Sequence, residues 1–163
     1  MTRFRLLRPT ALTVTALLLA ATGAAEPFPY MRKPEPNALY CMASVGDNCP
    51  VDDATVHSLI DDVARRFSLT RLEKSADGEP LFYVELYCHR QENGETAYSV
   101  ETGFAEWVGR PTQHLMKYAY YPYRSVGYGG AVDIRDTVRR RIEDALSDYL
   151  EANFPREGAG TGQ

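Results

Sequence analysis

The chain has 163 residues, of which 44% are hydrophobic and 25% charged, and its formal net charge at pH 7 is −4. This length supports one modest hydrophobic core rather than two. The acidic balance argues against nucleic acid or an anionic membrane surface as the main partner, because both attract clustered lysine and arginine.

The first 25 residues have the composition of a cleavable secretory signal peptide. Three arginines precede an apolar run over residues 11–21, and small residues follow up to Ala25. This is the order of charged, apolar and cleavage regions in a signal peptide. The apolar run is shorter than the roughly 20 residues that cross a bilayer, so we expect no stable membrane anchor after cleavage. Cleavage after Ala25 predicts a periplasmic or secreted protein with a net charge of −7, since three arginines and no acid are removed.

Residues 26–50 are predicted to form an extended Pro-rich leader, within which only residues 38–44 have the composition of a short strand. In an oxidising compartment, two of the three cysteines should pair. Cys41 and Cys49 flank a turn-rich segment, so we expect them to close a local loop and Cys88 to stay free. A bond from Cys88 to either of the other two would instead attach the leader to the sheet.

Two amphipathic helices are predicted, one before and one after the main run of predicted strands in the sequence. Two aspartates at positions 52 and 53 stand where an N-cap belongs, and the apolar residues up to Phe67 have helical spacing. A longer helix is expected to begin with Asp133 as its cap and to end before Pro155. Its apolar stripe consists of Ile134, Val138, Ile142, Ala145, Leu146, Tyr149 and Leu150. The tail at 155–163 is expected to be disordered.

Several strands are predicted between the two helices. Residues 69–74 alternate weakly, whereas residues 82–89 and 98–104 alternate clearly between apolar and polar side chains. A further long strand is expected over residues 113–121. Residues 125–130 contain three glycines and are predicted to be a loop.

The register of the central hairpin follows from its turn, Glu92-Asn93-Gly94. A two-residue loop would pair apolar with polar residues, whereas a three-residue loop pairs Phe82 with Phe104 and Leu86 with Val100. We therefore predict a type I turn with Gly94 in the left-handed conformation.

The predicted fold class is α+β. The domain at residues 51–154 is expected to be an antiparallel meander sheet of three to four strands, covered on one face by the two amphipathic helices.

The sequence contains no motif of a catalytic or cofactor site, and we expect no cofactor, no metal and no catalytic residue. Cys88 and His89 are neighbours in a strand, so their side chains point to opposite faces and cannot form a dyad. The three histidines lack the spacing of a metal site. The three glycines before the second helix lack the full fingerprint of a phosphate-binding loop. We therefore favour a protein that is not an enzyme.

The eleven tyrosines indicate a binding surface on the sheet face away from the helices. The predicted register gathers large aromatic residues there around the small Ser99, Gly103 and Ala105. These predicted binding residues are Tyr83, Tyr87, Trp107 and Tyr121. Tyrosine and tryptophan are enriched at binding surfaces, since they bury a large area at little cost in entropy.

Three functions follow, in order of preference. The first is an exported, non-enzymatic protein that binds a protein partner in the cell envelope through this aromatic face. The second is a small-ligand binding protein, for a glycan or a peptide, with a pocket between sheet and helices. The third is a hydrolase that uses Glu85, Glu101 or His89 on the open face.

Overall fold

The computed structural model describes residues 31–75, 79–108, 114–117 and 123–154. The predicted signal peptide and the predicted tail lie outside these residues. In chain order the elements are β1 (Ala38–Val45), α1 (Asp53–Arg66), β2 (Thr70–Leu72), β3 (Leu81–Arg90), β4 (Thr96–Val108), β5 (His114–Lys117), β6 (Tyr123–Gly129) and α2 (Ala131–Asn153).

The strands form a mixed sheet in the order β2-β1-β3-β4-β5, and β6 also pairs with β4. β1 runs parallel to β2 and to β3, whereas the pairs that involve β4 are antiparallel. The α+β class is confirmed, but the prediction of a purely antiparallel meander is wrong. The reason is the crossover through α1, which returns the chain beside β1 in the same direction. Such long-range pairing leaves no mark on the local alternation of side chains.

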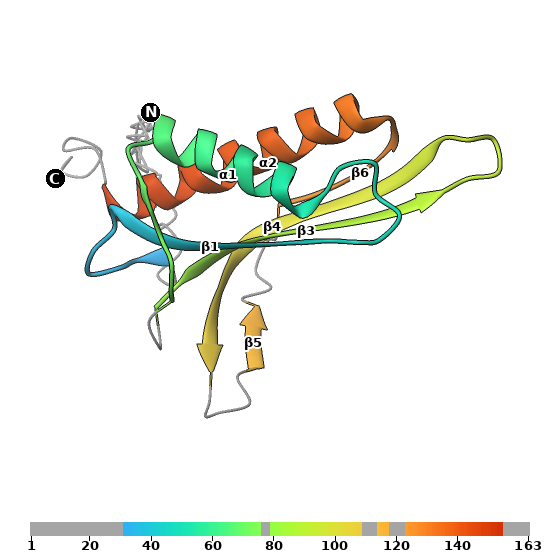
Figure 1. The fold of residues 1–163 in the computed structure, drawn as a ribbon. Helices are drawn as coiled ribbons and strands as arrows, with labels where there is room; N and C mark the ends of the chain where they lie inside the picture. The colour runs from blue at the N-terminus through green and yellow to red at the C-terminus, as the bar shows by residue number, and fades with distance from the viewer. Residues whose placement is uncertain (1–30, 76–78, 109–113, 118–122, 155–163) are drawn as a thin grey trace, which may run out of the picture.

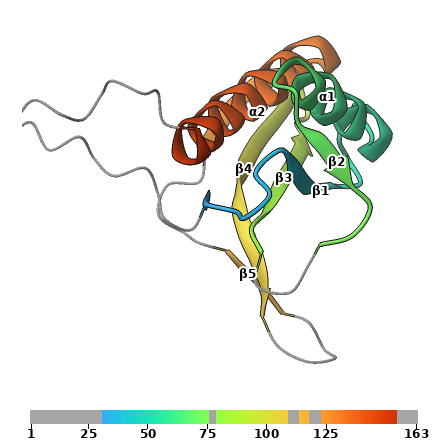
Figure 2. The same ribbon diagram turned by 90° about the vertical axis from the view of Figure 1, so that its left-hand side faces the viewer.

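Both helices lie on the same face of the sheet (Figures 1 and 2). Phe82, Val84 and Leu86 of β3 point toward the helices and are fully or almost fully buried. The predicted apolar stripe of α2 is buried as well, except for the half-buried Leu150. Phe104 and Tyr149 stack at the centre, with ring centroids 5.4 Å apart. None of the helices in the described part of the chain is long and apolar enough to span a bilayer.

The predicted aspartate cap is confirmed for α1 but is wrong for α2, whose N-cap is Gly130. Asp52 is the N-cap of α1, and its Oδ1 accepts hydrogen bonds from the Thr55 backbone N–H at 2.8 Å and the Thr55 hydroxyl at 2.6 Å. These bonds lower the pKa of Asp52. α2 begins three residues earlier than predicted. Asp133 accepts from the backbone N–H of Gly130 at 2.9 Å and so acts from inside the first turn.

The predicted register of the β3–β4 hairpin is confirmed. Phe82 pairs with Phe104 and Leu86 with Val100. Gly94 has φ +86°, the left-handed conformation that the three-residue turn requires. The hairpin therefore follows from local sequence alone.

Part of the predicted leader belongs to the folded domain. β1 lies inside the sheet between β2 and β3, and the residues just before it contact the end of α2. The Asn153 side chain accepts from Lys33 N and donates to Met31 O, both at 2.9 Å. Met31 is buried, and the buried Lys33 ammonium contacts Glu79 at 2.6 Å. The predicted boundary at residue 51 thus falls after the start of the domain.

The disulfide joins Cys49 to Cys88, so the predicted Cys41–Cys49 pair is wrong. Cys41 is free because its side chain points from β1 into the core, where burial raises the pKa of its thiol to about 12. The chain leaving β1 stays beside β3, since Gly46 N–H donates to Leu86 O at 2.8 Å. This contact brings Cys49 next to Cys88.

Candidate functional site

A shallow groove crosses the sheet face that the helices leave open, near the turn of the β3–β4 hairpin. Its centre is formed by small side chains of β4, and its two walls by larger side chains of β3 and β6. We call it the open-face groove. It consists of Tyr87 and His89 from β3, Ala97 and Ser99 from β4, and Val126 and Tyr128 from β6.

The register places these side chains in two rows. Ser99 lies between Tyr87 and Val126 in one row, and Ala97 lies between His89 and Tyr128 in the next. The groove has a volume of about 510 Å³. Because the central residues are small, the walls are separated by a floor that is mostly backbone.

Three of the groove's side chains are large, apolar and exposed. Tyr87 is 58% exposed, Val126 77% and Tyr128 66%. The other large hydrophobic side chains that are exposed in the described part of the chain lie apart from one another: Val132 is in the first turn of α2, and Phe154 follows its last residue. Exposed apolar side chains that gather in one place mark an interaction surface, whereas isolated ones are ordinary.

A polar row closes one end of the groove. Glu85, Glu101 and Arg124 lie side by side on adjacent strands. The Tyr87 hydroxyl donates to Glu85 Oε2 at 3.3 Å, and the Tyr83 hydroxyl donates to Glu101 Oε1 at 3.1 Å. The carboxylates proposed for a hydrolase are therefore cross-strand neighbours on an open surface.

The helix side of the same strands fixes the groove in place. The hydroxyls of Tyr98 and Thr137 are 3.0 Å apart and share a hydrogen bond that links β4 to α2. Arg141 Nε donates to Ser125 Oγ at 2.6 Å and links β6 to the same helix. Cys88, whose neighbours are Tyr87 and His89, is held by its disulfide. A Cys88–His89 dyad is thus absent, because the sulfur is already bonded.

Gly127 is required beneath the groove. A Cβ added there would lie 2.7 Å from Oη and 2.8 Å from Cζ of Tyr98, whose hydroxyl is bonded to Thr137. We expect Gly127→Ala to lower the free energy of unfolding by about 1–3 kcal/mol, because Tyr98 must shift in a packed site. Urea denaturation measures the change.

Gly130→Ser is the matched control for this prediction. A Cβ at Gly130 meets no heavy atom within 4 Å, and serine is favourable at an N-cap. Its stability should be unchanged or slightly higher. Equal losses in both variants would contradict the steric explanation.

The structure describes the side chains of two of the four predicted binding residues, and these two differ in burial. Tyr87 is exposed in the groove, but Tyr83 is 2% exposed and packs with Leu81 and Ala105 in a second small cluster on the open face. Trp107 lies in β4 opposite Leu115, and its side chain, like the whole of Tyr121, lies outside the described part of the structure.

Val126 and Tyr128 were missed because residues 125–130 were predicted to be a loop. The segment is the strand β6, and its residues alternate between half-buried and exposed positions. In the sequence, Val126 and Tyr128 alternate with small residues, and that period of two was the available signal. The glycines obscured it, although Gly127 serves close packing rather than a turn.

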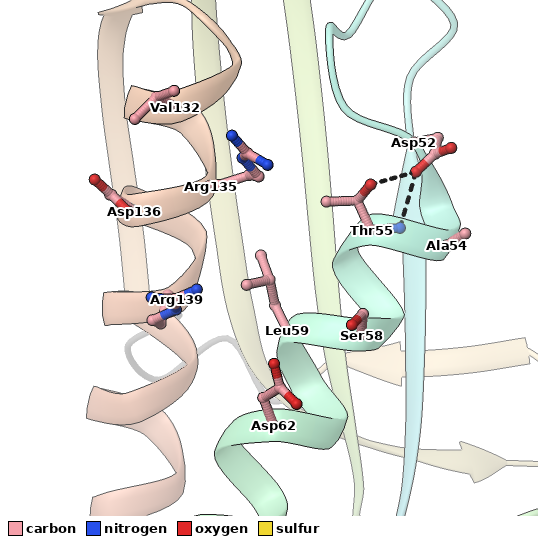
Figure 3. A pocket seen from close by; sticks show the side chains of 10 residues that line it. All are labelled: Asp52, Ala54, Thr55, Ser58, Leu59, Asp62, Val132, Arg135, Asp136 and Arg139. Atoms are coloured by element: carbon pink, nitrogen blue, oxygen red, sulfur yellow. Dashed lines mark hydrogen bonds between the residues drawn. The ribbon is translucent and has the colours of Figure 1, made fainter.

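A second groove lies between the first three turns of α1 and those of α2 (Figure 3). It has Leu59 of α1 between the helices and Arg135 and Arg139 on the α2 side. Its carboxylates are those of Asp52, Asp62 and Asp136. The described residues contain no cluster of histidine, cysteine and carboxylate side chains suited to a metal ion.

No protein-family model matches the chain, and no curated protein matches its sequence. Among solved structures, the chain is similar to a minor lipoprotein from Acinetobacter baumannii, with 11% sequence identity and a TM-score of 0.35. The match covers 71% of this chain and 90% of the lipoprotein.

Proposed function

We propose that this protein is an exported, non-enzymatic binding protein that holds a protein partner of the cell envelope in the open-face groove. The observation that carries the proposal is the gathering of Tyr87, Val126 and Tyr128, all more than half exposed, around a floor of small residues. Large apolar side chains beside small residues form a site where a partner's side chain can pack and displace water.

Two further observations support export. The order of charged, apolar and small residues in the first 25 positions is that of a signal peptide. The Cys49–Cys88 disulfide is of the kind that persists in oxidising compartments outside the cytoplasm.

The shape of the groove favours a protein partner over a small ligand. A ligand pocket between sheet and helices would need empty space there, but side chains of β3, β4 and α2 fill that layer and are fully buried. The groove itself is shallow and open. We therefore expect it to accept a projecting apolar or aromatic side chain of a partner surface.

Affinity capture from envelope extract tests the proposal with three baits of residues 26–163. These are the unmodified chain, the double variant Tyr87→Ser/Tyr128→Ser, and the control Val132→Ser. The control removes an apolar side chain that is 60% exposed on α2, outside the groove. Because all three sites are exposed, each variant should fold, which circular dichroism verifies.

We expect the unmodified chain and the control to retain the same protein and the double variant to lose it. The retained protein is then purified, and isothermal titration calorimetry should show at least about a tenfold loss of affinity for the double variant alone. If the double variant binds as tightly as the control, the groove is not the binding site.

A further inference from the structure

A second surface lies at the edge of the sheet, beside α1. β1 pairs with β3 over residues Cys41–Val45, but β2 pairs with the other edge of β1 only over Ala38–Tyr40. Among the described residues, no strand follows β2 along that edge. Within the part of the chain that the structure describes, the edge of β1 from Cys41 to Val45 is therefore free of backbone pairing.

Three hydrogen bonds establish which backbone groups face this edge. Gly46 N–H donates to Leu86 O in β3 at 2.8 Å, so the even-numbered residues of β1 direct their backbone groups to β3. On the edge of β1 that faces away from β3, Asn37 O accepts from Thr70 N at 2.7 Å. Cys41 O also faces that edge, where Arg71 Nη2 donates to it at 3.4 Å.

Successive residues of a strand present their backbone groups to alternate edges. Ala43 and Val45 therefore direct both N–H and C=O toward the free edge. Both residues are only partly buried. Four aligned hydrogen-bonding groups of this kind are a template for another extended chain.

A groove between β1 and α1 gives such a chain room as far as Ala43. It has a volume of about 680 Å³ and is lined by four consecutive β1 residues, Tyr40 to Ala43. His57 and Asp61 form the α1 wall, and Arg71 and Glu73 close the end at β2. Figure 2 shows β2 and β1 side by side beneath α1.

The side chain of Arg71 lies at this edge, next to the backbone carbonyl of Cys41. Its Nη1 donates to Asp61 Oδ1 at 2.9 Å, and its Nη2 donates to His57 Nδ1 at 2.9 Å as well as to Cys41 O. Burial and the neighbouring guanidinium lower the pKa of His57, which favours the neutral imidazole that can accept this bond. An incoming strand needs to displace only the longest of the three contacts.

We propose that this edge is a strand-addition site for an extended protein segment with alternating basic and apolar side chains. The backbone of the segment pairs with Ala43 and Val45. Its basic side chains meet the groove's two carboxylates, Asp61 and Glu73, which outnumber the single guanidinium of Arg71. Its apolar side chains lie on the other face, next to Tyr40 and Met42.

The test uses a blocked seven-residue peptide of alternating lysine and valine and residues 26–163 labelled with ¹⁵N. We expect the amide signals of Ala43 and Val45 to shift on titration and their hydrogen exchange to slow. Two further peptides carry N-methyl groups on the lysines only or on the valines only. Because alternate residues of the bound strand face β1, one methylated peptide should bind at least about tenfold more weakly and the other should bind almost normally.

Two protein variants complete the test. Ala43→Pro removes a donor that faces the free edge and leaves the bonds to β3, so it should weaken the parent peptide by a similar factor. The control Tyr87→Ser/Tyr128→Ser should bind the peptide normally, which separates this site from the open-face groove. If Ala43→Pro does not fold, the comparison of the two N-methylated peptides still tests whether the segment binds by strand addition.

The proposal is overturned if the parent peptide does not bind, if both methylated peptides bind equally, or if the shifted signals lie in the open-face groove. Loss of partner capture by Tyr87→Ser/Tyr128→Ser would not affect the strand-addition proposal, since the two sites use different strands.

Discussion

Replacing both Cys49 and Cys88 by alanine is expected to lower the free energy of unfolding by about 4 kcal/mol. The bond closes a loop with a sequence separation of 39 residues, so breaking it restores considerable entropy to the unfolded chain. The measurement is urea denaturation of the double variant and of the unmodified protein. The unmodified protein in a reducing agent should match the variant.

Cys41→Ala is the control for this prediction. It removes one buried sulfur without opening a loop and should cost less than half as much. Mass spectrometry of an unreduced digest should recover a linked fragment that contains residues 49 and 88. A Cys41–Cys49 fragment, or a larger loss from Cys41→Ala than from the pair, would contradict the observed connectivity.

The disulfide also holds the β3 wall of the open-face groove in place. Cys88 stands between Tyr87 and His89, and its partner lies in the segment between β1 and α1. The disulfide thus ties one wall of the groove to the N-terminal half of the domain. We expect its loss to loosen that wall before the rest of the sheet unfolds.

Tyr149→Ala is expected to lower the free energy of unfolding by about 3–5 kcal/mol. Tyr149 is fully buried and stacks on Phe104 at the centre of the core. Its hydroxyl donates to Pro36 O at 3.0 Å, and burial raises its pKa. Truncation therefore leaves a cavity and also removes one of the bonds that hold the segment before β1.

Tyr149→Phe separates these two contributions. It keeps the ring and removes only the hydrogen bond, so it should cost about 1 kcal/mol. Both variants are compared by urea denaturation. A loss from Tyr149→Phe as large as that from Tyr149→Ala would mean that the bond to Pro36, not the packing of the ring, holds this part of the domain together.

The sequence alone predicted the elements whose information is local. The apolar spacing of α1 and α2 and the alternation of β3 and β4 each report one buried face. The β3–β4 register could be predicted because the two strands are joined by a short turn, in which Gly94 permits only one matching of apolar faces. Tyr87 was found for the same reason.

Features that depend on distant parts of the chain were decided only by the tertiary structure. The parallel place of β1, the burial of Met31 and Tyr83, and the choice of Cys88 as the partner of Cys49 all follow from packing across many residues. The pairing of β6 with β4, which brings Val126 and Tyr128 to the far wall of the open-face groove, has the same origin. In the sequence, Gly127 resembles a turn residue. The structure shows that glycine is needed in this strand because the ring of Tyr98 lies against it. Local sequence patterns contain no information on such contacts between segments that only folding brings together.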